Sequence, residues 1–390
     1  MGSALSDTTL ALHQARAIAI NAACPQGDAH DVSGMLSQLG IVQLDSINVL
    51  ARAHQLALAS RVPHLTATEV DTSLWKGSAP VAFDYPAHAL ALVPLQDWPL
   101  WAFRRRVTRT RPEYPDQRTS QAMIGRIEKH GPLTMRELRG GEEPGSGWDW
   151  GPTKVSVEFL AWSGELVCAR RTRWQRVFDL PQRSIPSRYL TDSLTDEECL
   201  LQLLERAGRV LGVAAVDDLA DYIRIKARRV RELLPDTLLI PVAVQGWAEQ
   251  AWAHPEALAQ ADLPDQAMFV GPFDNLIWYR PRVARLFHFT QLLEAYKRPS
   301  QRTHGYYVCP LLVGSRLVGR ADFARHAHAL TILRISVDSL SLEILDGFTQ
   351  ACHRLSEIVE SPEIAIADDA SDPRTVRALR AALHSHESST

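Results

Sequence analysis

The sequence predicts an α+β protein in which tandem winged-helix units are followed by a small C-terminal antiparallel β-barrel. Helical hydrophobic spacing alternates with short hairpin-like segments over the first two thirds of the chain, and short apolar runs separated by turns follow from about Gln266. The 390 residues are 46% hydrophobic, which excludes disordered, collagen-like and disulfide-scaffold proteins. We expect winged-helix units at 1–112, 113–190 and 191–262, a β-barrel domain at 263–362 and a polar tail at 363–390.

The first unit is expected to begin with two short helices, because apolar residues recur with helical spacing over 10–23 and 32–39. Asp31 or Asp28 is placed to cap the second helix, and Gly40 is placed to close it. A short strand, a third helix and irregular strands then complete the order of a helix-turn-helix unit with a wing.

The second and third units repeat this order without sequence identity. In the second, Gly-rich residues 140–147 precede a candidate recognition helix and a hairpin with basic residues at its tip. The predicted helices are 120–129, 133–138, 154–162, 192–211, 215–222 and 224–233, and the predicted strands are 165–169, 175–179 and 238–244.

The last third is predicted to be mostly β-structure. A helix is expected near 287–296 and another at 349–359, and the polar residues after them are expected to be mobile. The predicted strands are 268–270, 276–279, 306–313, 317–321 and 330–337.

The net charge of −3 argues at first against a nucleic-acid partner. However, only five of the 42 basic residues are lysines, and arginine favours bidentate contacts to phosphate. A GC-rich genome is the simpler cause of this bias, and any one cluster can be a solvated helix face or a set of intramolecular ion pairs. Because each predicted unit has its own cluster, we nevertheless expect DNA contacts. The candidates are Arg104, Arg105, Arg106, Lys154, Arg170, Arg171, Arg173, Arg228 and Arg229.

The five cysteines are widely spaced without a Cys-x-x-Cys pair, and the 14 histidines lack ligand spacing, so we expect no metal and no cofactor. No signal-peptide segment or membrane span is expected. These features predict a cytoplasmic protein.

Six segments occur in one order along the chain, and together they resemble the YcaQ/AlkZ-type bacterial DNA glycosylases, which unhook interstrand crosslinks. The resemblance covers nearly the full length and implies tandem winged helices with a C-terminal β-barrel. The segments are Gln43-Leu44-Asp45, Gly147-Trp148-Asp149-Trp150, Arg176-Val177-Phe178-Asp179-Leu180, Leu219-Ala220-Asp221-Tyr222, Gly271-Pro272-Phe273-Asp274, and His304-Gly305-Tyr306-Tyr307-Val308 leading to Arg316-Leu317-Val318-Gly319-Arg320.

The run 41–48 is predicted to be extended, so Gln43 and Asp45 share one face while Leu44 turns toward the core. Taken alone, this spacing favours a structural role, in which Asp45 or Ser46 caps a helix starting at Ile47. The resemblance favours catalysis instead, because the family's motif is Gln, an apolar residue, then Gln or Asp. It implies that Asp45 and Gln43 are the catalytic residues.

The chemistry implied is hydrolysis of the N-glycosidic bond of N7-alkylguanine. The alkylated base is cationic and departs neutral, so the carboxylate of Asp45 would stabilise the oxocarbenium-like sugar and activate water, which Gln43 would hold. No lysine lies near the motif to act as a Schiff-base nucleophile, so no lyase activity is expected. We expect a monomer, associated with the nucleoid, that acts on double-stranded DNA containing alkylated or crosslinked guanine. The alternative is a non-catalytic winged-helix DNA-binding protein or transcription regulator.

Four further residues are candidates for supporting roles. His88 matches a family His, although Ala89 replaces the Glu that follows it there. Trp148 and Trp150 could stack on unpaired bases or simply pack in the core. His304 is a candidate phosphate contact or a surface turn residue.

Overall fold

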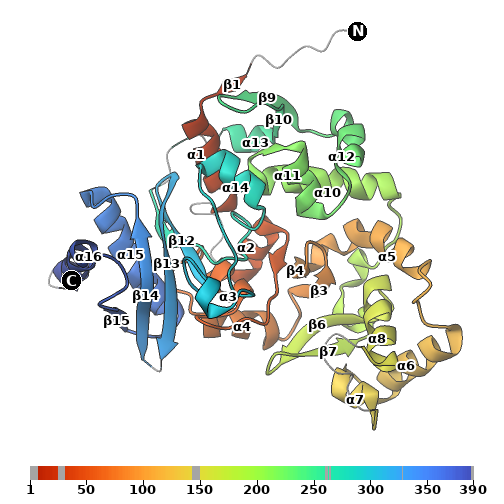
Figure 1. The fold of residues 1–390 in the computed structure, drawn as a ribbon. Coiled ribbons are helices and arrows are strands. Elements are labelled where there is room, and N and C mark those ends of the chain that lie inside the picture. The colour runs from red at the N-terminus through yellow and green to blue at the C-terminus, as the bar shows by residue number, and fades with distance from the viewer. Residues whose placement is uncertain are drawn as a thin grey trace.

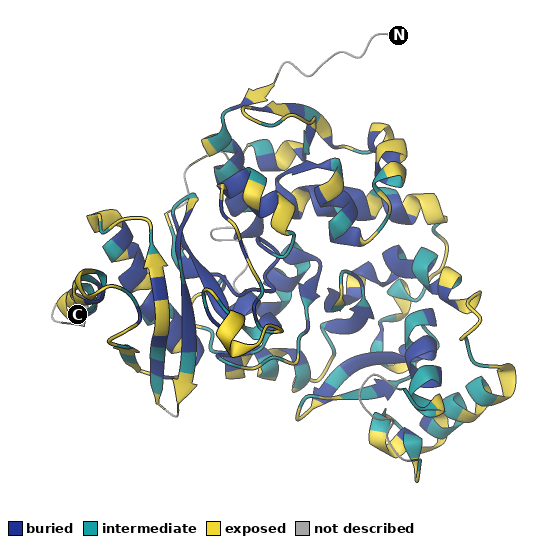
Figure 2. Cartoon of the chain, viewed as in Figure 1, coloured by how far each residue is buried: buried dark blue, intermediate teal, exposed yellow. Residues whose placement is uncertain are grey.

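The computed structural model describes residues 8–24, 31–142, 150–259, 262, 265–326 and 328–387. It is a mixed α+β structure in which three small sheets and one five-stranded sheet are surrounded by helices (Figure 1). Buried residues gather on the inner faces of helices and sheets, and exposed residues follow the outer helices (Figure 2).

Three successive stretches share one order of elements: helix, strand, two helices, then two strands. In each of them the third strand lies between the first and the second, which gives sheets β2-β4-β3, β5-β7-β6 and β8-β10-β9. The first stretch comprises α2 (Val32–Leu39), β2 (Val42–Gln43), α3 (Ala53–Ala59), α4 (Ala67–Trp75), β3 (Ala82–Pro86) and β4 (Leu90–Pro94). The second comprises α6 (Gln117–His130), β5 (Leu133–Thr134), α7 (Met135–Arg139), α8 (Pro152–Ser163), β6 (Val167–Thr172) and β7 (Gln175–Asp179). The third comprises α10 (Asp196–Leu211), β8 (Val213–Ala215), α11 (Val216–Ile223), α12 (Ala227–Leu233), β9 (Ile240–Val244) and β10 (Ala251–Ala253).

Local sequence explains where several of these helices begin and end. Asp31 caps α2 by accepting the backbone N–H of Gly34, and Gly40 follows the helix at φ 66°, so both predicted signals are confirmed. Thr195 and Glu198 form a reciprocal capping box at the start of α10.

The remaining elements join these stretches. The short strand β1 (Thr9–Leu10) pairs in parallel with β9 and so ties the N-terminus to the third stretch. The connecting helices are α1 (Leu12–Ala23), the 3₁₀ segment η1 (Leu95–Trp101), α5 (Ala102–Arg109), α9 (Pro181–Ser184), η2 (Ser187–Tyr189), η3 (Leu234–Asp236), α13 (Pro255–Leu258), α14 (Arg280–Phe287) and η4 (Pro299–Gln301).

The C-terminal sheet has the order β11-β12-β13-β14-β15 and curls into a half-barrel (Figure 1). Its strands are β11 (Ala267–Phe269), β12 (Val308–Val313), β13 (Arg316–His326), β14 (Ala329–Val337) and β15 (Glu363–Ile366). Among the described residues β11 and β15 are edge strands, so the predicted small antiparallel β-barrel is present as a half-barrel. The last pair, β14 and β15, is parallel. Helix α15 (Leu342–Ile358) packs against β11 and β12.

The structure corrects three further predictions. The chain after 362 is not a mobile tail, since β15 and α16 (Pro373–Glu387) follow and Val376, Leu379 and Leu383 are buried. The helix expected near 287–296 lies earlier, as α14, and ends at Phe287. The helix after the motif begins at Ala53 rather than at Ile47, so residues 46–52 form a loop.

Candidate active site

Gln43 is the last residue of β2, an edge strand of the sheet β2-β4-β3, and Asp45 follows it by two residues. Gln43 pairs with Ala91 of β4, and the backbone N–H of Leu44 donates to the carbonyl of Leu90 at 2.8 Å. Leu44 is 5% exposed, whereas Gln43 and Asp45 on either side of it are partly exposed. The burial pattern therefore matches the predicted alternation, with the apolar residue in the core and both polar residues on the other face.

The carboxylate of Asp45 makes a turn rather than a helix cap. Its Oδ1 accepts the backbone N–H of Ile47 at 2.8 Å. Within the part of the chain that the structure describes, neither the second oxygen of Asp45 nor the amide of Gln43 has a hydrogen-bond partner. Both groups can therefore bind water or a substrate.

The loop at 46–52 is held from two distant parts of the chain. Arg325, near the end of β13, donates to the carbonyl of Leu50 at 2.8 Å. Arg52 donates to the carbonyl of Ser46 at 3.4 Å, and its guanidinium lies 4.1 Å from the ring centre of Trp174. The C-terminal sheet and the β6–β7 hairpin thus meet at the loop that follows Asp45.

Trp174 lies at the tip of the β6–β7 hairpin and packs the hairpin against the first stretch. It has φ 70°, and its ring stacks on the fully buried His54 at 5.4 Å. Arg171 lies over the same ring at 4.1 Å and forms a buried ion pair with Asp84. Burial lowers the pKa of His54, even though Asp71 accepts a hydrogen bond from its ring at 2.8 Å. The hairpin therefore packs on the first stretch instead of reaching freely into solvent.

Residues in or next to two of the six sequence segments, those ending at Tyr222 and at Asp274, fix the chain just before Gln43. The hydroxyl of Tyr222 donates to the carbonyl of Leu39, and the amide of Asn275 donates to the carbonyl of Ile41 at 2.6 Å. Beside them, Asp274 receives two hydrogen bonds of 2.7 Å from the buried guanidinium of Arg61. The segments around Tyr222 and Asp274 are thus brought together at the strand that carries the motif.

Tyr307 is a buried residue near the motif that the sequence analysis noted only as part of a segment. It is fully buried, and its hydroxyl has no hydrogen-bond partner among the described residues. Burial raises the pKa of Tyr307 well above its usual range, with smaller electrostatic contributions from Cys309, Asp45 and Asp274. A neutral phenol therefore lies in the electrostatic environment of Asp45. Spacing alone carries no signal that could have assigned it there.

His88 has a packing role in the turn between β3 and β4. Its ring stacks on Trp278 at 4.0 Å and 6°, and one ring nitrogen lies 3.1 Å from the carbonyl of Asp221. The other nitrogen is 2.9 Å from a guanidinium nitrogen of Arg224. Burial and the charge of Arg224 lower the pKa of His88 to about 4, so the ring is neutral at pH 7.

Most of the arginines predicted to contact DNA also bond to other groups of the protein. Arg105 is buried and donates to the carbonyl of Trp98 at 2.6 Å. Two others bond to carbonyls: Arg104 to those of Pro86, Ala87 and Ile223, and Arg170 to those of Gly77 and Ser78. Four bond to carboxylates: Arg106 to Asp192 and Asp196, Arg171 to Asp84, Arg228 to Glu232, and Arg229 to Glu197 and Glu232. The ion-pair interpretation that the sequence left open describes Arg106, Arg171, Arg228 and Arg229, whereas Arg104, Arg105 and Arg170 bond to carbonyls. Buried Arg105 and Arg171 are not placed to reach DNA.

The remaining predicted contacts lie elsewhere. Arg173 is exposed at the β6–β7 tip, and Lys154 lies 4.2 Å from the ring centre of Trp150. Trp150 is half-buried beside Trp162 at 6.3 Å, and Trp148 is outside the described residues. His304 lines a pocket with Arg320 and Arg334.

The described residues contain no group of three or more His, Cys, Asp or Glu side chains suited to hold a metal ion. None of their helices combines the length and apolar character needed to cross a membrane.

The chain is similar to known proteins both in sequence pattern and in fold. A family model described as "DNA glycosylase AlkZ-like" matches residues 36–358. The solved structure of the Streptomyces sahachiroi DNA glycosylase AlkZ is similar, with a TM-score of 0.63 and 16% sequence identity over 92% of this chain and 99% of that chain. At this identity, the second comparison concerns the fold alone.

Proposed function

Because the chain belongs to the AlkZ-like DNA glycosylase family, we propose that it hydrolyses the N-glycosidic bond of N7-alkylguanine in double-stranded DNA, including guanine in interstrand crosslinks. One observation carries the proposal. Asp45 has one oxygen fixed by Ile47 and one without a described partner, next to a Gln43 amide that is equally unoccupied.

These groups match the needs of the reaction. N7-alkylguanine is cationic and leaves as a neutral base, so the step needs stabilisation of the positive sugar more than it needs a general acid. The free oxygen of Asp45 faces that charge and takes a proton from the attacking water, and the amide of Gln43 holds the water. The loop at 46–52 contains no lysine, so we propose direct hydrolysis without a Schiff base or strand cleavage.

We also propose that the three repeated stretches are winged helices that surround the duplex. Their identical strand orders support this interpretation. A crosslinked base cannot be fully extruded into a closed pocket, so a surface formed between such units suits it better.

The experiment uses duplex DNA with a single N7-methylguanine, and a second duplex with a nitrogen-mustard crosslink. Abasic sites are measured under single-turnover conditions after heating in alkali. We expect Asp45→Asn to slow the reaction about 10²- to 10³-fold, as loss of a preorganised electrostatic group does. Gln43→Ala should slow it roughly tenfold to a hundredfold, the effect of one or two hydrogen bonds.

Asp346→Asn is the matched control, because Asp346 is exposed on α15 and its charge change is identical. It should react like the unmodified chain. Equal activity of Asp45→Asn would remove Asp45 from the mechanism. Salt-sensitive DNA binding without any abasic product would instead favour a non-catalytic winged-helix protein or regulator. Strand breaks before the alkali step would overturn the monofunctional assignment.

A further inference from the structure

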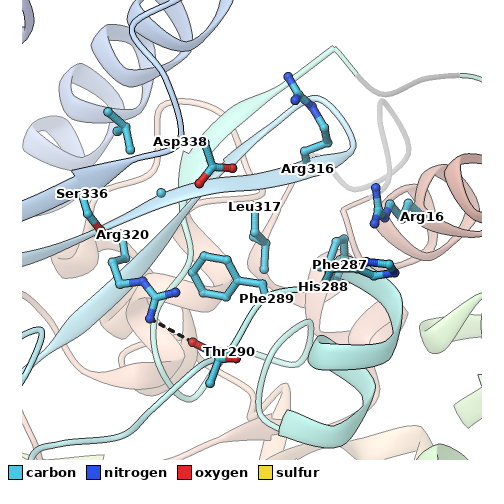
Figure 3. Close-up of a pocket in the computed structure, with 12 residues that line it drawn as sticks. Arg16, Phe287, His288, Phe289, Thr290, Arg316, Leu317, Arg320, Ser336 and Asp338 are labelled. Carbon is cyan, nitrogen blue, oxygen red and sulfur yellow. Dashed lines mark hydrogen bonds between the residues drawn. The ribbon is translucent and has the colours of Figure 1, made fainter.

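A basic groove runs along the C-terminal sheet, separate from Gln43 and Asp45. One part is a pocket of about 510 Å³ between α1, the end of α14 and β13, with Arg16, His288, Arg316 and Arg320 among its lining residues (Figure 3). A second pocket of about 370 Å³ contains His304 and Arg334 and shares Arg320 and Ser336 with the first. The two pockets therefore adjoin at Arg320 and Ser336, and together they are called the groove below. It contains four arginines, and its acidic lining residues are Asp338 and Asp369.

The arginines of this groove differ from those that join parts of the protein. In the described part of the chain, Arg16, Arg320 and Arg334 have no carboxylate within ion-pair distance, although Arg316 pairs with Glu343. Each of the three uses a donor on a backbone carbonyl: Arg16 on Leu286 at 2.6 Å, Arg320 on Thr290 at 2.9 Å and Arg334 on Arg302 at 3.3 Å. Their guanidinium groups are therefore held in place by carbonyls rather than by direct ion pairs, although Asp338 and Glu294 are close enough to Arg320 to act on its charge.

The environment of these arginines favours an anion. Arg320 is fixed over the ring of Phe289 at 4.1 Å, which leaves its other N–H groups for a ligand (Figure 3). Burial and the charge of Arg316 lower the pKa of Arg16, a sign of like charges held close together. On β14, Ser336 lies directly opposite Arg320, and Arg334 is two residues from Ser336 on the same face. A row of donors thus follows the sheet.

The groove lies on the strand whose far end contacts the loop after Asp45. Arg325, at that end of β13, donates to the carbonyl of Leu50. Arg320 is five residues away along the strand, about 16 Å at ~3.3 Å per residue, and this odd spacing directs the two side chains to opposite faces of the sheet. That distance is about five base pairs at 3.4 Å per base pair.

From this placement we propose that the groove formed by Arg16, Arg320, Arg334 and His304 binds backbone phosphates of the DNA duplex beside the lesion. The inference rests on the proposed function for its substrate, but its binding test is independent of catalysis. Two adjoining basic pockets suit successive phosphates of a chain rather than one small anion. The groove positions DNA and takes no part in bond cleavage.

The test measures the affinity of the full chain for undamaged and N7-methylguanine duplexes by fluorescence anisotropy over a range of salt concentrations. Arg320→Ala and Arg334→Ala should each weaken binding to both duplexes equally. Each should also reduce the slope of log K against log salt by about 0.9, the effect of one lost phosphate contact. Arg377→Ala, on an exposed residue of α16, is the matched control and should change neither quantity.

Two further measurements separate this proposal from its rivals. The single-turnover rate at saturating protein should stay within about twofold for Arg334→Ala, because binding is then complete in both proteins. A hairpin-capped duplex with about three base pairs on each side of the lesion is too short to reach the groove and should bind both proteins equally.

If DNA affinity and its salt dependence are unchanged in both variants, the groove does not bind DNA phosphates, whether or not Asp45→Asn is inactive. Stabilisation of the protein by inorganic phosphate, lost in Arg334→Ala while DNA affinity is unchanged, would assign the groove to a small phosphate ligand instead. Since Arg320→Ala also removes packing on Phe289, its melting temperature is compared first, and the exposed Arg334 provides the test if that variant unfolds.

Discussion

Asp45 accepts the backbone N–H of Ile47 at 2.8 Å, so the carboxylate proposed to do chemistry also shapes the loop that follows it. The two roles can be separated by substitution. Asn keeps an oxygen for the Ile47 bond but removes the charge, whereas Ala removes both.

We therefore expect Asp45→Asn to unfold at the same urea concentration as the unmodified chain while it loses activity. Asp45→Ala should lose about 1 kcal/mol of unfolding free energy in addition, the net value of one hydrogen bond. Urea denaturation followed by tryptophan fluorescence measures the difference. Equal stability of the two variants would mean that the Ile47 bond does not hold the loop.

Trp174 should couple the β6–β7 hairpin to the motif loop. Trp174→Ala removes the stack on His54 and the contacts of Arg52 and Arg171, and should cost about 2–3 kcal/mol because the ring is half-buried. It should also slow the single-turnover rate more than it weakens DNA binding, since Arg52 bonds to Ser46. Trp174→Phe should restore part of both losses. The neighbouring exposed residue gives the control, Arg173→Ala, which should leave stability unchanged.

The buried pair of Arg61 and Asp274 should be costly to break from one side. Arg61→Met leaves the Asp274 carboxylate buried without its cation and should lower the unfolding free energy by about 3–5 kcal/mol. The double variant Arg61→Met with Asp274→Leu should recover part of that loss, because no unpaired charge remains. By contrast, Arg228→Ala breaks a solvent-exposed pair with Glu232 and should leave the unfolding free energy nearly unchanged. A double variant less stable than the single one would argue against this account.

His88 should make stability depend on pH below neutrality. Its pKa is lowered from 6.5 to about 4 in the folded protein, so the unfolded chain takes up the proton first as pH falls. The contribution of His88 is thus complete above pH 6.5 and is lost as pH falls toward 4. Urea unfolding of the unmodified chain and of His88→Asn should show a stability gap that narrows between pH 7 and pH 4. If the difference in unfolding free energy between the two proteins stays constant or widens as pH falls, the pKa of His88 is not lowered in the folded protein.

Local structure was largely readable from the sequence. The cap at Asp31, the stop at Gly40 and the burial of Leu44 between Gln43 and Asp45 depend on residues a few positions apart, and all three occur in the structure. The helix boundary after the motif was missed because Asp45 bonds to Ile47 in a turn, and helix capping and this turn use the same side-chain acceptor.

The sequence by itself therefore determined the α+β character, the order of helices and hairpins, and the Gln43-Leu44-Asp45 segment as the candidate for chemistry. Only the tertiary structure decided which arginines are available to a ligand. Arg106 and Arg171 find carboxylates more than 80 residues away, whereas Arg320 and Arg334 find only carbonyls. A guanidinium is neutralised by the groups that surround it in space, and the spacing of residues along a chain does not record those groups. For the same reason, a C-terminal segment that is polar in sequence packs as a strand and a helix, because the sheet offers it an edge and an apolar surface to cover.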